Sequence, residues 1–201
     1  MTTVPDGCFA SNTAEQHLAV RDPTLGRVIK SQTLMWPHRR TEHPIGGLVR
    51  IVMAQQVSTR WACNLAERAR CAFPKLTAPR PEDAPDVLGL RALGLSRSRA
   101  ECCSEIVRRC NEILAKIEKG HSWEQSLIDI KGIGPWTISV FRIMVLREPD
   151  VLPLGDVGLE RAIVNVYGRR RDVERLGERW RPFRSVACWY LWRTLGNEQL
   201  G

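Results

Sequence analysis

Two glycines within eight residues constrain the fold of this chain more than any other feature of its sequence. The stretch runs from Ile130 to Thr137 as IKGIGPWT, between two segments with helical periodicity. Glycine permits backbone angles and close approaches that a side chain would forbid, and Pro135 suits the first position of a new helix. That helix would present its free N–H groups and the positive end of its dipole at the turn. The stretch therefore predicts two helices joined by a tight turn, with an anion site at the turn.

A phosphate of a DNA backbone is the anion that suits this turn best. A nucleotide-binding glycine loop is disfavoured because Thr137 stands where GxGxxG requires a third glycine, and because no strand precedes the turn. An ordinary helix connection with a glycine C-cap remains the alternative. Such backbone contacts carry no sequence information. The residues expected to contact the DNA backbone are Lys131, Gly132, Ile133, Gly134 and Thr137.

The charge of the chain agrees with a polyanionic partner. Its 30 basic and 22 acidic residues give a formal net charge of +8 and an isoelectric point near 9.5. Many of the cations are arginines, whose planar group forks onto phosphate oxygens. Charge alone would fit a solvated surface equally well.

The cysteines and histidines predict no zinc site. Seven cysteines are scattered without a close CxxC pair, and the four histidines form no cluster of metal ligands. With no apolar signal segment ahead of them, the cysteines indicate an intracellular chain with reduced thiols. The most apolar stretch, Trp136 to Leu146, is too short to cross a bilayer.

Helical periodicity runs through most of the chain, and no series of strands is visible, so we predict an all-α fold. The first forty residues show little periodicity and are expected to form an irregular or weakly helical arm. The proline-rich stretch 74–85 should be mostly loop. Helices are expected within 45–72 (one or two), in a short segment before Gly94, from the N-cap Ser96 to Gly120, over 122–130, 135–147 and 156–168, and over 183–195.

Four segments in order resemble the helix-hairpin-helix superfamily of base-excision DNA glycosylases, most of all 3-methyladenine DNA glycosylase II. LIDIKGIGPWTISVFRIMVL followed by PDVLPLGDVGLERAI resembles the hairpin, the Gly/Pro-rich loop and the aspartate of the family. IVMAQQVS, LGLSRSRA and WRPFRSVACWYLWR are similar to three further family segments. The resemblance covers roughly Leu48 to Leu195.

The resemblance implies two helical lobes with an active-site cleft between them. We expect a central bundle over 48–151 that includes the hairpin at 122–147, and a second lobe formed by 1–47 and 152–201. The arm before Thr41 is too short for the N-terminal β domain of the larger bacterial relatives. The cleft would hold a nucleotide flipped out of the duplex.

By this resemblance, Asp156 is the catalytic carboxylate. Breaking an N-glycosidic bond places positive charge on the sugar, which a facing carboxylate stabilises while it orients or deprotonates water. Without the family match, a plain N-cap aspartate would be the simpler interpretation. Bifunctional relatives carry a lysine two residues after the second hairpin glycine, where this chain has Trp136. We therefore expect base release that leaves the abasic site intact, because no amine is available there for covalent catalysis.

No cofactor is expected to be required. The iron-sulfur branch of the superfamily has four closely spaced cysteines near the C-terminus, whereas only Cys188 lies in that region here. In relatives, carbonyls of the hairpin bind a monovalent cation. The positions that match here are Ile128, Ile130 and Ile133, which would hold K⁺ or Na⁺.

Aromatic side chains are candidates for the base pocket because alkylated purines are cationic and electron-poor. The candidates are Trp136, Trp189, Tyr190 and Trp192, although tryptophans at helical spacing also serve as core residues. Gln55 and Gln56 resemble the segment that fills the gap left by the flipped base, and a polar kink between two helices is the alternative.

The function predicted is a monofunctional glycosylase that removes 3-methyladenine, 7-methylguanine or similar lesions from double-stranded DNA. A glycosylase of the same fold for uracil, mismatched thymine, or deaminated or etheno bases stays open. So does a non-catalytic DNA-binding module, which would not need Asp156. We expect a monomer with no membrane partner, located in the cytoplasm and nucleoid or in a nucleus.

Overall fold

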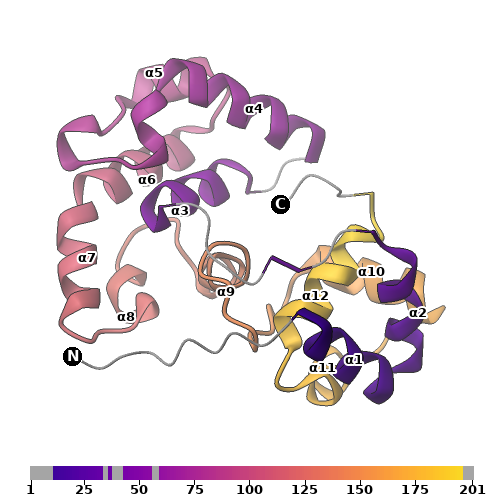
Figure 1. Cartoon of the computed structure of the whole chain (residues 1–201). Helices are drawn as coiled ribbons and strands as arrows, with labels where there is room; N and C mark the ends of the chain where they lie inside the picture. The colour runs from indigo at the N-terminus through magenta and orange to yellow at the C-terminus, as the bar shows by residue number, and fades with distance from the viewer. Residues whose placement is uncertain (1–10, 34–35, 38–42, 56–58, 197–201) are drawn as a thin grey trace. The chain divides into compact units, whose positions relative to one another are not determined.

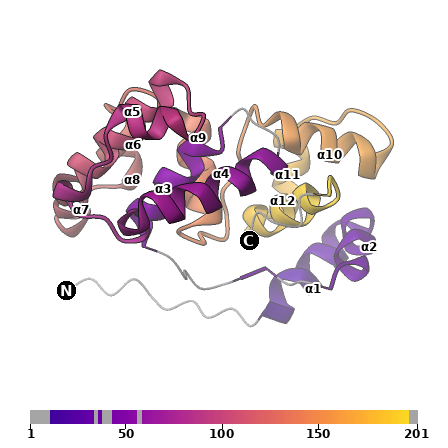
Figure 2. The same ribbon diagram turned by 90° about the horizontal axis from the view of Figure 1, so that it is seen from above.

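The computed structural model of the chain describes residues 11–33, 36–37, 43–55 and 59–196. Within these ranges the regular structure consists of α-helices and two short 3₁₀ helices, with no strand. The all-α prediction is confirmed. Figures 1 and 2 show the helices from two directions.

The chain divides into two compact units. We call residues 1–40 and 147–198 the terminal unit, and residues 41–146 the central unit. The sequence prediction drew the boundaries at 48 and 151. Among the described residues, 11–37 and 147–196 therefore belong to one unit, and the central unit lies between these two segments in the sequence.

The central unit is built around α6, which packs against α3 and α5, while α3 also packs against α9 (Figure 1). Leu48, Ile106 and Phe141 are fully buried in this unit. Its elements are α3 (Pro44–Met53), α4 (Thr59–Ala72), η1 (Pro74–Thr77), η2 (Pro81–Asp83), α5 (Val87–Ala92), α6 (Arg97–Arg108), α7 (Cys110–Glu118), α8 (Trp123–Leu127) and α9 (Pro135–Met144).

Three of the predicted helices in this unit are too long, and one of them, expected over 135–147, ends at Met144. The helix expected from Ser96 to Gly120 is interrupted at Arg109, whose guanidinium binds Glu112 at 2.9 Å and Asp129 at 2.8 Å. The helix expected over 122–130 ends at Leu127, and a turn continues to the hairpin. At Arg109 and after Leu127, contacts with neighbouring segments end the helix, although the periodicity of the sequence would allow it to continue.

The terminal unit joins two N-terminal helices to three from the end of the chain (Figure 2). Every residue from Ser185 to Trp192 is buried, so α12 is its central helix. The arm, expected to be irregular or weakly helical, forms two helices, and Asp22 caps the second one by accepting a hydrogen bond from Leu25 N at 3.1 Å. The elements are α1 (Ser11–Arg21), α2 (Pro23–Ser31), α10 (Val157–Tyr167), α11 (Val173–Trp180) and α12 (Arg184–Arg193).

The described ranges contain no helix with the length and apolar character that a bilayer crossing needs. The five cysteines whose side chains are described are free thiols: Cys71, Cys102, Cys103, Cys110 and Cys188.

Candidate active site and hairpin

Asp156 is a buried carboxylate at the start of α10, with 8% of its surface exposed. Its Oδ1 accepts a hydrogen bond from Leu159 N in the first turn and a second from Trp192 Nε1 at 2.9 Å. These donors fix the direction of the carboxylate. Burial, together with the Asp156 charge, raises the pKa of the nearby Cys188 thiol. That sulfur therefore stays protonated.

The loop that leads to Asp156 is held by the N-terminus of α12. Arg184 Nε donates to Asp150 Oδ1 at 2.7 Å, and its Nη2 donates to the Asp150 carbonyl at 2.9 Å. The buried Ser185 hydroxyl accepts from Val151 N at 2.9 Å. Because Trp192 lies on the same helix, α12 holds this segment at two points.

A small residue and two exposed apolar residues lie near Asp156 in the sequence. A Cβ at Gly158 would lie 3.1 Å from Asp156 Oδ1, so a side chain there would crowd the carboxylate, and it would touch the Trp192 ring at 3.7 Å. Leu154 and Val157, close to Asp156 in the sequence, are exposed apolar residues, with 50% and 68% of their surfaces accessible. The sequence analysis missed Gly158, although a glycine in the first turn of a helix is a signal of close approach.

The aromatic candidates lie in different surroundings. Trp192 contacts Asp156 directly, as described above. Trp189 packs edge-on against Trp36 with ring centres 6.0 Å apart, and the Arg193 guanidinium lies 4.8 Å from its ring centre. Tyr190 donates its hydroxyl to Glu15 Oε1 at 3.1 Å, and burial with this charge raises the phenol pKa. The structure thus brings Trp192 to the carboxylate and ties Tyr190 to the N-terminal helix α1.

Trp136, the remaining aromatic candidate, is a half-buried residue in the first turn of α9 in the central unit. The pocket role of all four aromatic residues stays a prediction.

The hairpin has the local geometry expected from its sequence. Ser122 and Gln125 form a capping box at the start of α8, and Gly134 precedes Pro135 at the N-terminus of α9. Gly132 has φ of +100°, which disfavours any residue with a side chain. Ile130 and Ile133 are 2% and 6% exposed and anchor the turn.

The side chains at the hairpin differ in their accessibility. Lys131 is exposed and forms no ion pair within the described residues, so its ammonium is available for a phosphate. Thr137 is only 3% exposed, and its hydroxyl accepts a hydrogen bond from Gln55 Nε2 at 2.8 Å. Gln56 lies outside the described residues.

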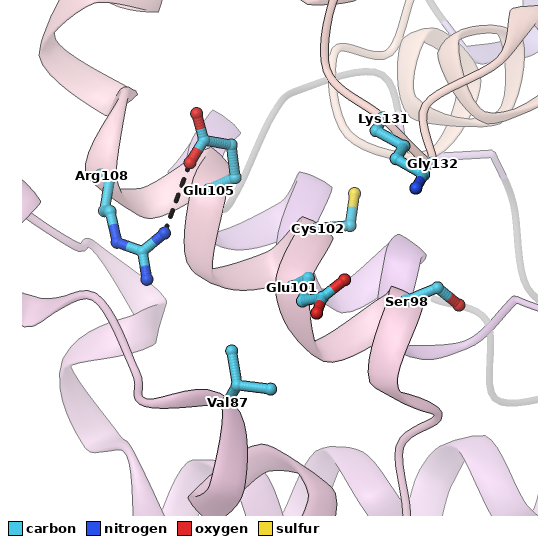
Figure 3. A pocket seen from close by; sticks show the side chains of 8 residues that line it. All are labelled: Val87, Ser98, Glu101, Cys102, Glu105, Arg108, Lys131 and Gly132. Carbon is cyan, nitrogen blue, oxygen red and sulfur yellow. Dashed lines mark hydrogen bonds and ion pairs between the residues drawn. The ribbon is translucent and has the colours of Figure 1, made fainter.

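A cavity of about 500 Å³ lies where the hairpin meets α6. Figure 3 shows Lys131 and Gly132 across from the α6 side chains of Ser98, Glu101 and Cys102. Burial, and to a lesser degree the Glu105 charge, raises the pKa of Cys102 to about 11. This sulfur is therefore a neutral packing group beneath the turn.

The three hairpin carbonyls proposed for a cation have the right chemistry, since backbone oxygens are the ligands that K⁺ meets in selective sites. Ile130 O accepts a hydrogen bond from Ile133 N at 3.0 Å. Within the described residues, the carbonyls of Ile128 and Ile133 accept no hydrogen bond. This set of oxygens therefore fits a monovalent cation.

Comparisons with known proteins point to one group of enzymes. The chain is 30% identical over 161 residues to a probable bifunctional transcriptional activator and DNA repair enzyme AlkA of Mycobacterium tuberculosis, which covers 73% of this chain and 32% of the relative. The chain thus spans about a third of that relative's length. It is 29% identical to DNA-3-methyladenine glycosylase 1 of Schizosaccharomyces pombe, over 90% of this chain and 86% of the relative.

A solved structure agrees with these relatives. The 3-methyladenine DNA glycosylase of Schizosaccharomyces pombe in complex with abasic DNA superposes with a TM-score of 0.77 and 26% identity, over 91% of this chain and 96% of that one. No family model matches the chain.

Proposed function

The chain belongs to the helix-hairpin-helix superfamily of base-excision DNA glycosylases, and from this premise we propose that it hydrolyses the N-glycosidic bond of alkylated purines in double-stranded DNA. The products are the free base and an intact abasic site. The enzyme acts as a monomer on DNA inside the cell.

The orientation of Asp156 is the observation that carries this proposal. Trp192 Nε1 and Leu159 N hold one carboxylate oxygen in place, so the charge is positioned before substrate arrives. As the glycosidic bond lengthens, positive charge develops on the sugar, and a fixed carboxylate stabilises it without reorganisation. The same carboxylate orients a water molecule and accepts its proton as the new C–O bond forms.

The hairpin supplies the grip on the DNA backbone. The free N–H groups at the start of α9 and the exposed Lys131 ammonium bind one phosphate without reading a base. A monovalent cation on the carbonyls of Ile128, Ile130 and Ile133 would add positive charge beside that phosphate. No other cofactor is needed for hydrolysis.

Trp136 makes the enzyme monofunctional in this proposal. It occupies the position of the lysine nucleophile in bifunctional relatives, and an indole forms no Schiff base with the sugar. Borohydride should trap no covalent complex with DNA. Efficient trapping would contradict the hydrolytic assignment.

Alkylated purines are the proposed substrates because their positive charge weakens the glycosidic bond and attracts electron-rich rings. Trp192, whose indole contacts Asp156, is the aromatic residue best suited to touch the flipped base.

A panel of lesions tests the function directly. Duplexes that carry 3-methyladenine, 7-methylguanine, ethenoadenine, hypoxanthine or uracil are incubated with the wild type and with Asp156→Asn, and the released bases are identified. Release of methylated purines by the wild type alone is expected. Release of uracil alone would assign a different substrate class, and release of no base would favour a DNA-binding module.

A further inference from the structure

Gln55 follows α3 directly, and its backbone is fixed by an arginine of α6. Arg99 Nη1 donates hydrogen bonds to the carbonyls of Met53 at 3.1 Å and Gln55 at 3.0 Å. The guanidinium also lies 5.7 Å from the centre of the Trp61 ring. The exit from α3 is therefore held in one direction, and the Gln55 side chain starts from a defined position.

The carboxamide of Gln55 connects two parts of the hairpin. Its Nε2 donates to Thr137 Oγ1 at 2.8 Å and to the Gly132 carbonyl at 3.3 Å. Since a carbonyl only accepts, the amide nitrogen must face Gly132, and its two N–H groups then serve both partners. One side chain thus links the turn to the first turn of the helix that follows it.

The turn is also supported from α6. A Cβ at Gly132 would lie 3.1 Å from Cys102 Sγ and 3.2 Å from its Cβ, so the backbone rests directly on this buried cysteine. Arg99 and Cys102 lie one helical turn apart on α6. The same helix therefore holds both the Gln55 backbone and the hairpin that the Gln55 side chain binds.

A side chain that fills the gap in a base stack has to extend into the duplex with its polar group available. Both N–H donors of the Gln55 amide are instead used within the central unit. We propose that Gln55 is a positioning residue: by tying Gly132 to Thr137 it sets the arrangement of the hairpin N–H groups that grip a DNA phosphate. This inference rests on the proposed DNA-binding function, and it assigns Gln55 a role that does not involve the flipped base.

The test compares four variants in binding to an undamaged duplex, so that its result does not depend on base excision. Gln55→Met and Thr137→Val each remove the hydrogen bond between Gln55 Nε2 and Thr137 Oγ1 while keeping the side-chain size. The double variant removes both partners of this bond. Thr137→Ser keeps the hydroxyl and serves as the rescue. Gln16→Met, at an exposed position of α1, is the matched control for the glutamine change.

Each single variant should raise the Kd for the duplex by about threefold to tenfold, the usual effect of losing such a bond. The double variant should be no weaker than Gln55→Met, because that change already removes the bond to the Thr137 hydroxyl as well as the bond to the Gly132 carbonyl. Thr137→Ser and Gln16→Met should bind like the wild type. Melting temperatures of all variants should remain close to that of the wild type, so that weaker binding is not the result of unfolding.

Three results would overturn the inference. The first is wild-type binding by both Gln55→Met and Thr137→Val. The second is a strictly additive double variant. The third concerns both single variants. Thr137→Val binds like the wild type, whereas Gln55→Met excises the base slowly when the lesion is paired and at the wild-type rate when the lesion faces an abasic site. That pattern is the behaviour of a residue that fills the gap in the base stack. Failure of the proposed chemistry would show separately, as DNA binding without release of any base.

Discussion

Two buried aspartates begin helices in the terminal unit, and their surroundings differ. Asp22 is 3% exposed and uses both oxygens: Oδ1 accepts from Leu25 N, while Oδ2 accepts from Tyr167 at 2.7 Å and Trp180 at 3.1 Å. It thereby joins α2, α10 and α11.

Asp156 has a similar cap and a similar tryptophan donor, but the residues near it in the sequence, Leu154 and Val157, are exposed and apolar. The same local pattern therefore serves as a structural junction at one site and as a candidate reactive group at the other. A helix cap with a tryptophan donor does not identify a catalytic residue by itself.

The strongest test of this difference is the isosteric change at Asp156. Asp156→Asn should slow base excision by about a thousandfold, because the amide provides neither negative charge nor a base. Asparagine is a good N-cap, so the free energy of unfolding should change little. Single-turnover excision and urea unfolding measure the two effects, and an active Asp156→Asn enzyme would remove the distinction between the aspartates.

The opposite result is expected at the structural junction. Asp22→Ala should lower the free energy of unfolding by about 2–4 kcal/mol, since it removes a cap and leaves two buried donors unpaired. Its excision rate below the unfolding transition should match the wild type. Asp172→Ala removes an exposed cap on α11 that binds Arg175 N at 3.1 Å, and should cost about 1 kcal/mol. Equal losses for the two variants would contradict the proposed role of Asp22.

The two tryptophan donors offer a finer comparison. Trp192→Phe keeps a ring but removes the N–H that orients Asp156, and excision should fall about tenfold. Trp180→Phe removes the corresponding N–H from Asp22 and should cost about 1 kcal/mol of stability without slowing excision. The excision rate and the free energy of unfolding are measured for both variants. A wild-type excision rate for Trp192→Phe would contradict the proposed role of its N–H in orienting Asp156.

The smallest effect concerns alkaline pH. Burial, the hydrogen bond to Asp22 and its charge raise the pKa of Tyr167 above its ordinary value of 10.0. The folded protein therefore keeps the phenol proton where the unfolded chain loses it, so stability is intact below about pH 10 and falls above it. Tyr167→Phe should reduce this alkaline loss in unfolding experiments. The pKa of Tyr190 is also raised, so Tyr190 would account for any loss of stability at alkaline pH that remains in the Tyr167→Phe variant.

Much of the fold follows from local signals in the sequence. Periodicity and caps predicted α10, its end at Gly168 and the buried α12, because there the local preference and the tertiary contacts agree. The arm was harder to predict. The Asp22–Pro23 pair is a good start signal for α2, but the partners that bury Asp22, Tyr167 and Trp180, come from far along the chain.

The candidate site was predictable in part for a similar reason. Asp156 and the hairpin are contiguous motifs, and a motif can be read without knowing the fold. The bonds of Gln55 span 77 and 82 residues, and the resemblance pointed to a different role for it. Trp189, Tyr190 and Trp192 all lie in one helical segment of the sequence, which does not distinguish them. In the structure Trp192 donates a hydrogen bond to the carboxylate, whereas Tyr190 binds Glu15 of α1 and Trp189 packs against Trp36.

The double attachment of the Asp156 segment to α12 fixes how many residues can lie between the two points. Ser185 binds Val151, and Trp192 binds Asp156. The five-residue step from Val151 to Asp156 must therefore match the distance between Ser185 and Trp192 along α12. One inserted residue adds about 3.3 Å of extended chain, which exceeds the reach of a hydrogen bond. The length of the loop is therefore set by the helix to which both of its ends are attached.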